Sequence, residues 1–85
     1  SWLRLQWREE GDHIAEARFT AFGCPVGIAV GAWLCERLRS QPLDALGGFD
    51  ATTLRTALEI PDDKLHCAFM GEDALNLLLK DRLKP

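Results

Sequence analysis

The sequence predicts an α+β fold, in which a small antiparallel sheet formed by an N-terminal hairpin is covered on one face by helices. Two observations carry this prediction. Side chains alternate with a period of two up to about residue 22, and a helical period begins immediately afterwards, at Pro25. With 85 residues, the chain is long enough for one modest hydrophobic core. We therefore expect residues 1–85 to form a single domain.

The first strand is predicted from Trp2 to Arg8. Leu3, Leu5 and Trp7 fall on one face and polar side chains on the other, which is the alternation of a half-buried strand. Trp2 does not fit this pattern, because it falls on the polar face.

A second strand is predicted from His13 to Phe22, where Ala17 and Phe19 share the apolar face. A short loop containing Gly11 joins the two strands, so they form an antiparallel hairpin. Two strands alone make a marginal sheet. Either the helices cover one face of the hairpin entirely, or a further strand lies upstream in the intact protein.

The first helix is expected from Pro25 to about Arg39, because proline suits the first turn and apolar residues recur at helical spacing. Gly27 and Gly31 lie four residues apart and leave a smooth surface that another element can approach closely. Cys35 lies within this helix, and we expect it to be a core residue.

Shorter elements follow. One turn is expected from Pro42 to Leu46, ended by Gly47 and Gly48. Asp50 is a suitable N-cap for a helix over 51–58, and residues 59–63 are expected to form a loop.

The final helix runs from Leu65 to about Leu83, with Lys80, Arg82 and Lys84 complementing its dipole. We interpret Glu72 and Asp73 as first-turn acids of this helix rather than catalytic groups. The three tryptophans are interpreted as core or interface residues: Trp2, Trp7 and Trp33.

Composition narrows the possible partners. Ten basic residues against thirteen acidic ones give a net charge of −3, and the basic residues are scattered, which argues against nucleic acid and anionic membranes. No apolar run approaches a membrane span, and no secretory signal is visible. The chain begins at Ser1 without a methionine, so we expect either a tag remnant or a cut into a longer protein.

Three cysteines, with no secretory signal, argue against a disulfide framework and favour a reducing cytoplasm. Cys24 and Cys67 both lie at the starts of predicted helices, where a thiolate is favoured, and His66 is adjacent to Cys67. Thiolate and neutral imidazole are the usual protein ligands of zinc and iron–sulfur centres. The residues alone leave two alternatives open. One is that both cysteines are small buried hydrophobes. The other is a thiol enzyme with His66 as base, although neighbours on a helix do not face each other.

Four segments together resemble the IscU/NifU-type scaffold proteins of iron–sulfur cluster assembly, over nearly the whole chain from Leu3 onward. They are residues 17–24 (Ala-Arg-Phe-Thr-Ala-Phe-Gly-Cys), Ile28-Ala29, residues 64–67 (Lys-Leu-His-Cys) and residues 72–75 (Glu-Asp-Ala-Leu). The resemblance implies a SufE/NifU-like (IscU-like) α+β fold, with helices covering one face of a small antiparallel sheet.

The resemblance also implies a scaffold rather than an enzyme. Such a protein binds iron, a transient [2Fe-2S] cluster or zinc, receives sulfur from a cysteine desulfurase and passes the cluster to acceptor apo-proteins. Cys24 matches the family's second cysteine, Cys67 its third, His66 its histidine and Lys64 a lysine beside the site.

The chain departs from the family pattern in three places. The family's first cysteine would fall just before Ser1, and the acid that follows it would fall at about Ser1, so the domain is expected to lack the family's N-terminal segment and the strand within it. The segment that an Hsp70-type chaperone recognises, Leu-Pro-Pro-Val-Lys, reads Ile-Pro-Asp-Asp-Lys at residues 60–64, which argues against chaperone docking. These departures leave open an alternative, a degenerate relative that acts only as a protein-interaction module.

Overall fold

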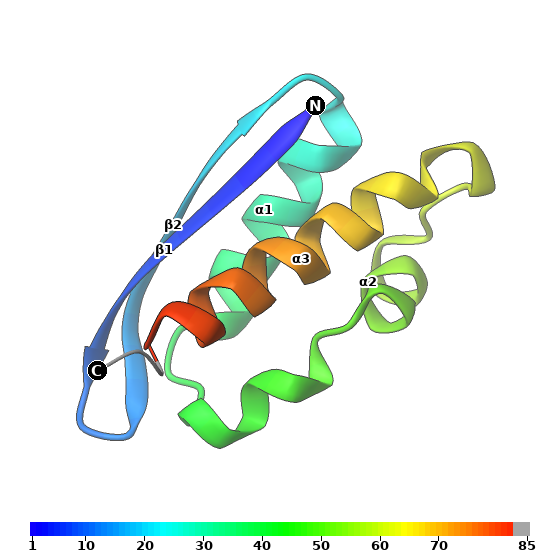
Figure 1. Cartoon of the computed structure of the whole chain (residues 1–85). Helices are drawn as coiled ribbons and strands as arrows, with labels where there is room; N and C mark the ends of the chain where they lie inside the picture. The colour runs from blue at the N-terminus through cyan, green and yellow to red at the C-terminus, as the bar shows by residue number, and fades with distance from the viewer. Residues whose placement is uncertain (83–85) are drawn as a thin grey trace.

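The computed structural model describes residues 1–82 (Figure 1). In this range the chain forms a hairpin followed by helices, arranged in two layers. The predicted α+β architecture is confirmed. No helix in this range is both long and apolar enough to cross a membrane. The elements are β1 (Trp2–Glu10), β2 (His13–Phe22), α1 (Pro25–Leu38), the 3-10 helix η1 (Leu43–Gly48), α2 (Ala51–Leu58), the 3-10 helix η2 (Asp62–Lys64) and α3 (Leu65–Arg82).

The two strands pair antiparallel over their full length, from Trp2 opposite Phe22 to Glu10 opposite His13. The pairing shifts by one residue after Arg8, and such a bulge increases the local twist of a hairpin. Because pairing continues to Glu10, β1 is two residues longer than its alternation predicted, whereas β2 has the predicted bounds.

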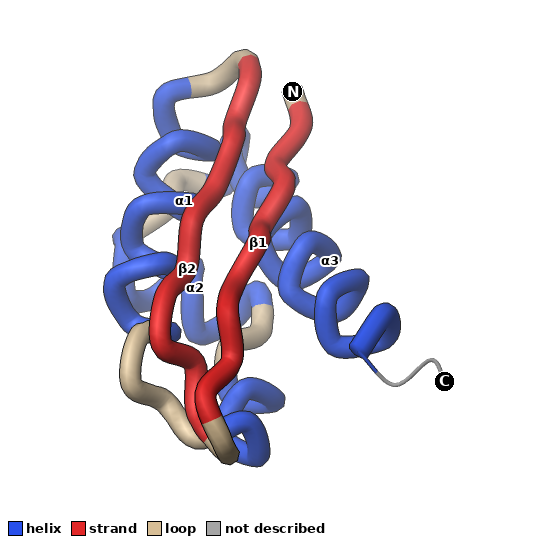
Figure 2. The backbone as a smooth tube through the Cα atoms, turned by 90° about the vertical axis from the view of Figure 1, so that its left-hand side faces the viewer, coloured by secondary structure: helices blue, strands red, loops and turns tan. Residues whose placement is uncertain are grey.

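Helices α1 and α3 cover one face of the hairpin, as predicted, and Figure 2 shows the other face open towards the viewer. Leu5 and Ile14 lie on the covered face and are buried. Trp2 and Phe22 pair across the strands on the open face, with exposed fractions of 49% and 71%. Within residues 1–82, the outer edge of β1 pairs with no further strand.

Glycines allow the helices to approach their neighbours closely. At Gly31 a Cβ atom would overlap the ring of Phe19 on β2, and at Gly27 it would lie 2.8 Å from Met70 on α3. The smooth surface predicted for these two glycines is therefore used by two different elements. At Gly71 a Cβ atom would lie 2.5 Å from a Val30 side-chain atom, so α3 packs tightly on α1 there.

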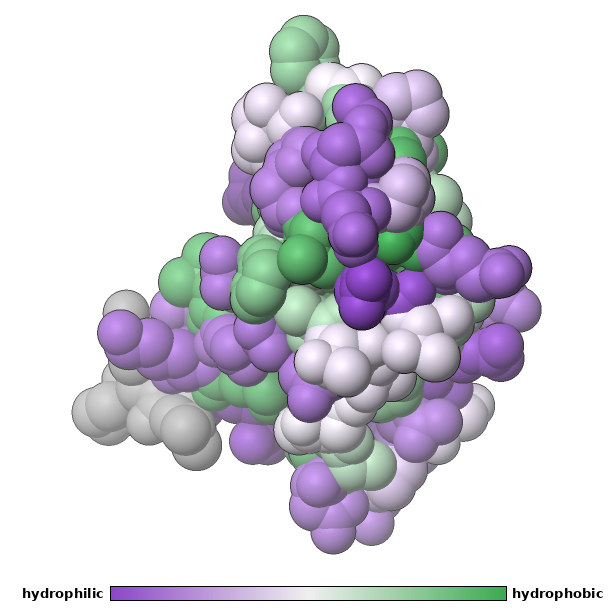
Figure 3. Space-filling view, turned by 90° about the vertical axis from the view of Figure 1, so that its right-hand side faces the viewer, coloured by the Kyte–Doolittle hydropathy of each residue, from purple (hydrophilic) through white to green (hydrophobic). Residues whose placement is uncertain are grey.

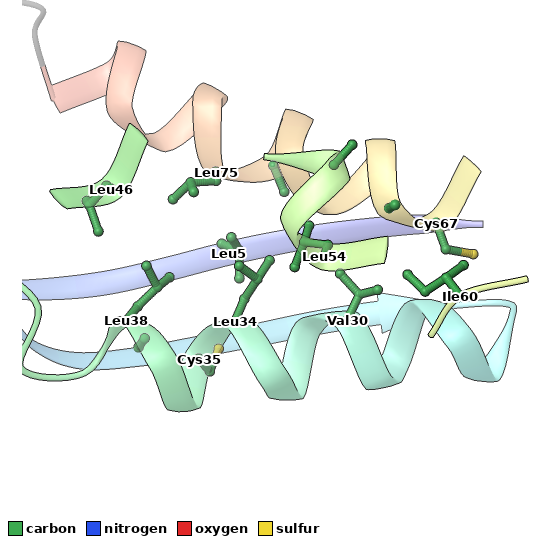
Figure 4. Close-up of a cluster of buried hydrophobic side chains, with 14 of the residues drawn as sticks. Leu5, Val30, Leu34, Cys35, Leu38, Leu46, Leu54, Ile60, Cys67 and Leu75 are labelled. Atoms are coloured by element: carbon green, nitrogen blue, oxygen red, sulfur yellow. The ribbon is translucent and has the colours of Figure 1, made fainter. Parts of the chain in front are cut away.

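One hydrophobic cluster joins the sheet to the helices (Figure 4). Cys35 belongs to it and is 4% exposed, which confirms its predicted place in the core. Cys67 lies at one end of the cluster, beside Ile60, and is fully buried. The buried members are Leu5, Ile14, Ala17, Val30, Leu34, Cys35, Leu38, Leu46, Ala51, Leu54, Ile60, Cys67, Ala68, Ala74 and Leu75.

The connections differ from the predictions in detail. Gly47 and Gly48 are the last two residues of η1, so this turn extends two residues beyond its predicted end at Leu46. The predicted loop is present over residues 59–61, but a 3-10 turn, η2, begins at Asp62, and its Lys64 N–H donates to the Pro61 carbonyl at 2.9 Å. Asp50 caps α2 as predicted, accepting from the Thr53 N–H at 2.9 Å. The expected helix end at Leu83 and the role of Lys84 fall outside the described residues.

The interpretation of Glu72 and Asp73 as first-turn acids is wrong. Helix α3 begins at Leu65, so both acids lie two turns further on, and its first turn contains no acid. The Glu72 carboxylate instead accepts a hydrogen bond at 3.2 Å from the N–H of Ala51, the first residue of α2. The role of Glu72 depends on the packing of α3 against α2, so it could not be predicted from the local sequence pattern.

Candidate metal centre

Cys24 lies at the bend between β2 and α1. Gly23 before it has φ +114°, and a Cβ atom there would also collide with Ser1, so only glycine fits the bend. Cys24 itself is extended and serves as the N-cap of α1, with Pro25 starting the helix. Its carbonyl accepts from the N–H groups of Gly27 (3.0 Å) and Ile28 (3.3 Å).

The position of Cys24 favours its thiolate. The pKa of this thiol is lowered, chiefly by the N–H of Val26, and partial burial opposes the effect. Smaller contributions in the same direction come from the N–H of Gly27, from the Cys67 thiol and from the positive charge of Lys64. These contacts act electrostatically, because the Cys24 side chain makes no formal capping hydrogen bond.

Cys67 is the third residue of α3, and its environment has the opposite effect. Burial raises the pKa of the Cys67 thiol, the neighbouring Cys24 thiol raises it further, and Lys64 partly offsets both. The exposed His66 imidazole reaches back to this thiol, with 3.5 Å between Nε2 and the sulfur. The expectation that these sequence neighbours would not face each other is therefore wrong.

The structure brings the three predicted residues to one end of the fold in two pairs. The Cys24 and Cys67 thiols influence each other's pKa, Cys67 lowering that of Cys24 and Cys24 raising that of Cys67, and Cys67 also contacts His66. Among residues 1–82, no three His, Cys, Asp or Glu side chains are grouped so as to hold one metal ion. The site therefore contains two thiols and one imidazole, and Cys67 belongs to both pairs. These are soft donors, of the kind that zinc and iron–sulfur centres select.

An open hollow of about 510 Å³ adjoins His66, and neither Cys24 nor Cys67 lines it. Its rim includes His66 and the exposed apolar side chains of Trp2, Phe69 and Leu77. Sequence reasoning did not single out this apolar rim. The spacing of His66, Phe69 and Leu77, which places them along one side of a helix, was the available signal.

Ser1 lies next to Cys24 in the site. The Cys24 N–H donates to its hydroxyl oxygen at 3.4 Å, which ties the start of β1 to the start of α1. The resemblance assigned an acid to about this position, and the structure shows that the serine there directly adjoins the bend that carries Cys24.

Comparison with known proteins shows which family this chain resembles. A family model described as the NifU-like N terminal domain matches residues 2–83. The chain is 32% identical over 79 residues to the iron-sulfur cluster assembly protein IscU of Plasmodium falciparum, covering 93% of this chain and 49% of that protein. It is 33% identical over 80 residues to the iron-sulfur cluster assembly enzyme IscU of Drosophila melanogaster, covering 93% of this chain and 52% of the relative.

A bacterial relative is similar to the same degree. The iron-sulfur cluster assembly scaffold protein IscU of Escherichia coli is 32% identical over 79 residues, covering 93% of this chain and 61% of that protein. The chain thus spans about half the length of the curated relatives it matches. The match over almost all of its own residues, on a hairpin-and-helix fold with its cysteines at two helix starts, shows that the chain belongs to the NifU-like N terminal domain family.

Proposed function

We propose that this domain is a scaffold for iron–sulfur cluster assembly, and that Cys24, His66 and Cys67 hold the metal. The observation that carries the proposal is that the starts of α1 and α3 supply two thiols that influence each other's pKa, with an imidazole in contact with one of them. Iron and sulfide are the cargo of this site. Zinc is expected to bind the same donors when iron is absent.

The number of donors sets how firmly a cluster is held. The two irons of a [2Fe-2S] cluster together need four protein ligands, and the predicted set contains three. Water, a small thiol, a partner's residue or a residue outside these 85 would complete the set. An incompletely ligated cluster is exposed to exchange, which suits a protein that must hand its cargo on. We therefore expect tight zinc binding and a short-lived cluster in this chain.

The thiol-enzyme alternative is disfavoured by the electrostatics of the pair. A nucleophilic cysteine needs a lowered thiol pKa and a base oriented by a third group. The Cys67 thiol, which contacts His66, has a raised pKa, whereas the Cys24 thiol, whose pKa is lowered, makes no hydrogen bond to His66 among the described residues. In the described part of the chain, His66 makes no other hydrogen bond that would orient it. A scaffold without turnover of its own is the better account.

The proposed partners follow from the resemblance and are a cysteine desulfurase that supplies sulfur and apo-proteins that accept the cluster. An Hsp70-type chaperone is not expected to bind the segment over 60–64. Ile60 in this segment is buried, and Asp62 is paired with Arg55 at 2.7 Å. The surrounding face mixes hydrophilic and hydrophobic side chains, with a hydrophilic group at its upper centre (Figure 3). Free thiols require a reducing compartment, and we propose the cytoplasm.

Metal content tests the proposal most directly. Protein purified without chelator should contain about one zinc per chain. Its affinity for zinc should fall as the buffer is acidified, since protons compete for the thiolate and imidazole donors. Anaerobic addition of iron and sulfide should then give a visible cluster absorbance that decays and that an apo-protein acceptor can take up.

Cys35→Ala is the matched control, because it removes a cysteine from the core and leaves the site intact. Folded protein that takes up neither zinc nor a cluster would refute the scaffold proposal and favour the degenerate, interaction-only alternative. Zinc content that depends on Cys35 rather than Cys24 would show that the wrong cysteines had been assigned.

A further inference from the structure

Met70, the only methionine in the chain, packs between α3 and α1, the two helices whose starts carry the cysteines of the predicted metal site. It follows Cys67 by three residues on α3, so the two side chains share one side of that helix. Its methyl group covers Gly27, which follows Cys24 by three residues. A Cβ atom at Gly27 would lie 2.8 Å from Met70 Cε, and among residues 1–82 this is the one contact within 4 Å that such an atom would make with another element.

The Met70 side chain can be reached from solvent. It is partly buried and packs against the hydrophobic cluster, yet it also lines the hollow of about 510 Å³ next to His66. Cys67, one turn earlier on the same helix, is fully buried. A small oxidant such as hydrogen peroxide that enters the hollow therefore meets the thioether of Met70, a group that peroxide converts to a sulfoxide.

We propose that Met70 is a site of reversible oxidation, and that its sulfoxide loosens α3 from α1 and thereby weakens metal binding by Cys24 and Cys67. The thioether sulfur attacks one oxygen of hydrogen peroxide, so that an S–O bond forms and the O–O bond breaks. The sulfur gives up two electrons, and the proton of the transferred oxygen passes to the departing hydroxide, which leaves as water. The effect on metal rests on the scaffold function proposed above, whereas the oxidation and the loosening do not.

The space over Gly27 fits an apolar methyl group and does not fit a sulfoxide. A sulfoxide oxygen is polar, and burying it against the helix without a donor is unfavourable. The Gly27 N–H is already donated to the Cys24 carbonyl at 3.0 Å. Turning the oxygen into the hollow instead would draw the methyl group away from Gly27. The helices have no spare room beside it, since a Cβ atom at Gly71 would lie 2.5 Å from a Val30 side-chain atom. Both outcomes therefore disturb the packing that holds the two predicted thiol donors.

Hydrogen peroxide added to the zinc-loaded chain tests the proposal, with Met70→Leu as the matched control. The peptide that contains Met70 should gain one oxygen, measured by mass spectrometry, while a coloured indicator records the release of zinc. Met70→Leu keeps an apolar side chain of similar volume, so it should fold normally and keep its zinc under the same dose of peroxide. Methionine sulfoxide reductases should restore zinc binding to the oxidised protein. Equal zinc release from Met70→Leu would trace the loss to the cysteines and overturn the proposal.

Met70→Gln separates the effect on packing from the oxidation itself, because it introduces a polar side chain without peroxide. Its zinc affinity should be about tenfold lower, the lower end of the cost of disturbing groups around metal ligands. The thermal midpoint of its metal-free form should fall by about 4–8 °C, the shift typical of one weakened contact in a domain of this size. Unchanged zinc affinity in Met70→Gln, or a Met70 that stays unoxidised while the cysteines react, would each overturn the proposal. If the reduced chain binds no zinc at all, the scaffold function fails by itself, and the peptide mass and the thermal midpoint still decide whether oxidation of Met70 loosens the fold.

Discussion

The two ends of the two-layer fold are held in different ways. At the hairpin-turn end, the chain after α1 is bonded to β2 in both directions, with Ser40 N–H donating to the Ile14 carbonyl at 2.8 Å and Ile14 N–H to the Gln41 carbonyl at 3.1 Å. Arg82 at the end of α3 donates two hydrogen bonds to Glu9 on β1, at 2.9 and 3.1 Å. At the cysteine end, a long hydrogen bond of 3.4 Å from the Cys24 N–H to the Ser1 hydroxyl joins the start of α1 to the residue before β1.

This difference between the two ends suggests that one end contributes mainly to stability and the other mainly to metal binding. The turn end fixes the hairpin against the helices, so buried side chains there should determine the free energy of unfolding. The cysteine end carries the predicted metal donors, and its aromatic side chains Trp2, Phe22 and Phe69 are about half or more exposed. Substitution of the exposed aromatic side chains there should leave stability almost unchanged, whereas substitution of the cysteines should change metal binding. Variants at the two ends of the fold test this separation.

The largest expected effect is on zinc affinity. Cys24→Ser and Cys67→Ser should each lower it by more than about 100-fold, because loss of a direct ligand exceeds the 10- to 100-fold cost of disturbing an outer-shell partner. Titration against a competing chelator measures this effect. Cys35→Ala should bind zinc like the original chain, and a similar loss in that variant would contradict the site assignment.

The next largest effect compares two positions on β2. Ile14 is fully buried at the turn end, so Ile14→Ala should cost about 2–5 kcal/mol of unfolding free energy. Phe22 is 71% exposed at the cysteine end, and Phe22→Ala should change stability by no more than about 0.5 kcal/mol. Urea unfolding of both variants measures the difference. Equal costs would show that the open face near Phe22 is covered in solution.

Local periodicity was enough to predict most of the fold. The bounds of β2 and α2 were predicted to the residue, because alternation, a cap at Asp50 and prolines at Pro25 and Pro61 all act over a few positions. The errors occurred where contacts between elements decide the outcome. The extension of β1 depends on its pairing, and the role of Glu72 depends on the proximity of α2.

The site was only partly predictable from the sequence. Cys24 and Cys67 are more than forty residues apart, so spacing alone carried no signal. Their positions at helix starts did carry a signal, and the influence of the two thiols on each other's pKa is consistent with it. The contact of His66 with Cys67 was missed, since it depends on how the imidazole folds back over the first turn of α3. Side-chain direction is a property of the packed helix.

A smaller effect is expected midway between the two ends, at Glu72. Glu72→Ala removes the acceptor for the Ala51 N–H and should cost about 1 kcal/mol, the usual value of a helix N-cap. Glu72→Gln keeps an acceptor and should recover most of that loss. Asp73→Ala, at the exposed acid next in sequence, is the charge-matched control for chemical unfolding. If both alanine variants lose the same amount, the effect is one of charge or helix propensity rather than capping.

The smallest effect should come from the ion pair at the turn end, and acid should abolish it. The pKa of the Glu9 carboxyl is held below its ordinary value of 4.5, chiefly by the hydrogen bond from Arg82, with burial opposing and Trp7 N–H adding to the shift. A carboxyl whose pKa is lowered on folding contributes stability that is present above the unfolded value. That contribution is lost as the pH falls through the folded value.

Glu9→Gln should therefore lower the thermal midpoint at pH 7 by about 2–4 °C, a shift typical of a weak, partly exposed pair in a domain of this size. The difference between the two proteins should narrow below pH 4.5 and vanish once the original carboxyl is protonated. Glu10→Gln is the matched control, because Glu10 pairs only within the hairpin, with Arg8, and does not join the hairpin to α3. Its midpoint should stay unchanged. A Glu9→Gln deficit that persists undiminished in acid would show that the side chain acts by packing on Trp7, and the turn end would then owe its stability to burial and backbone hydrogen bonds alone.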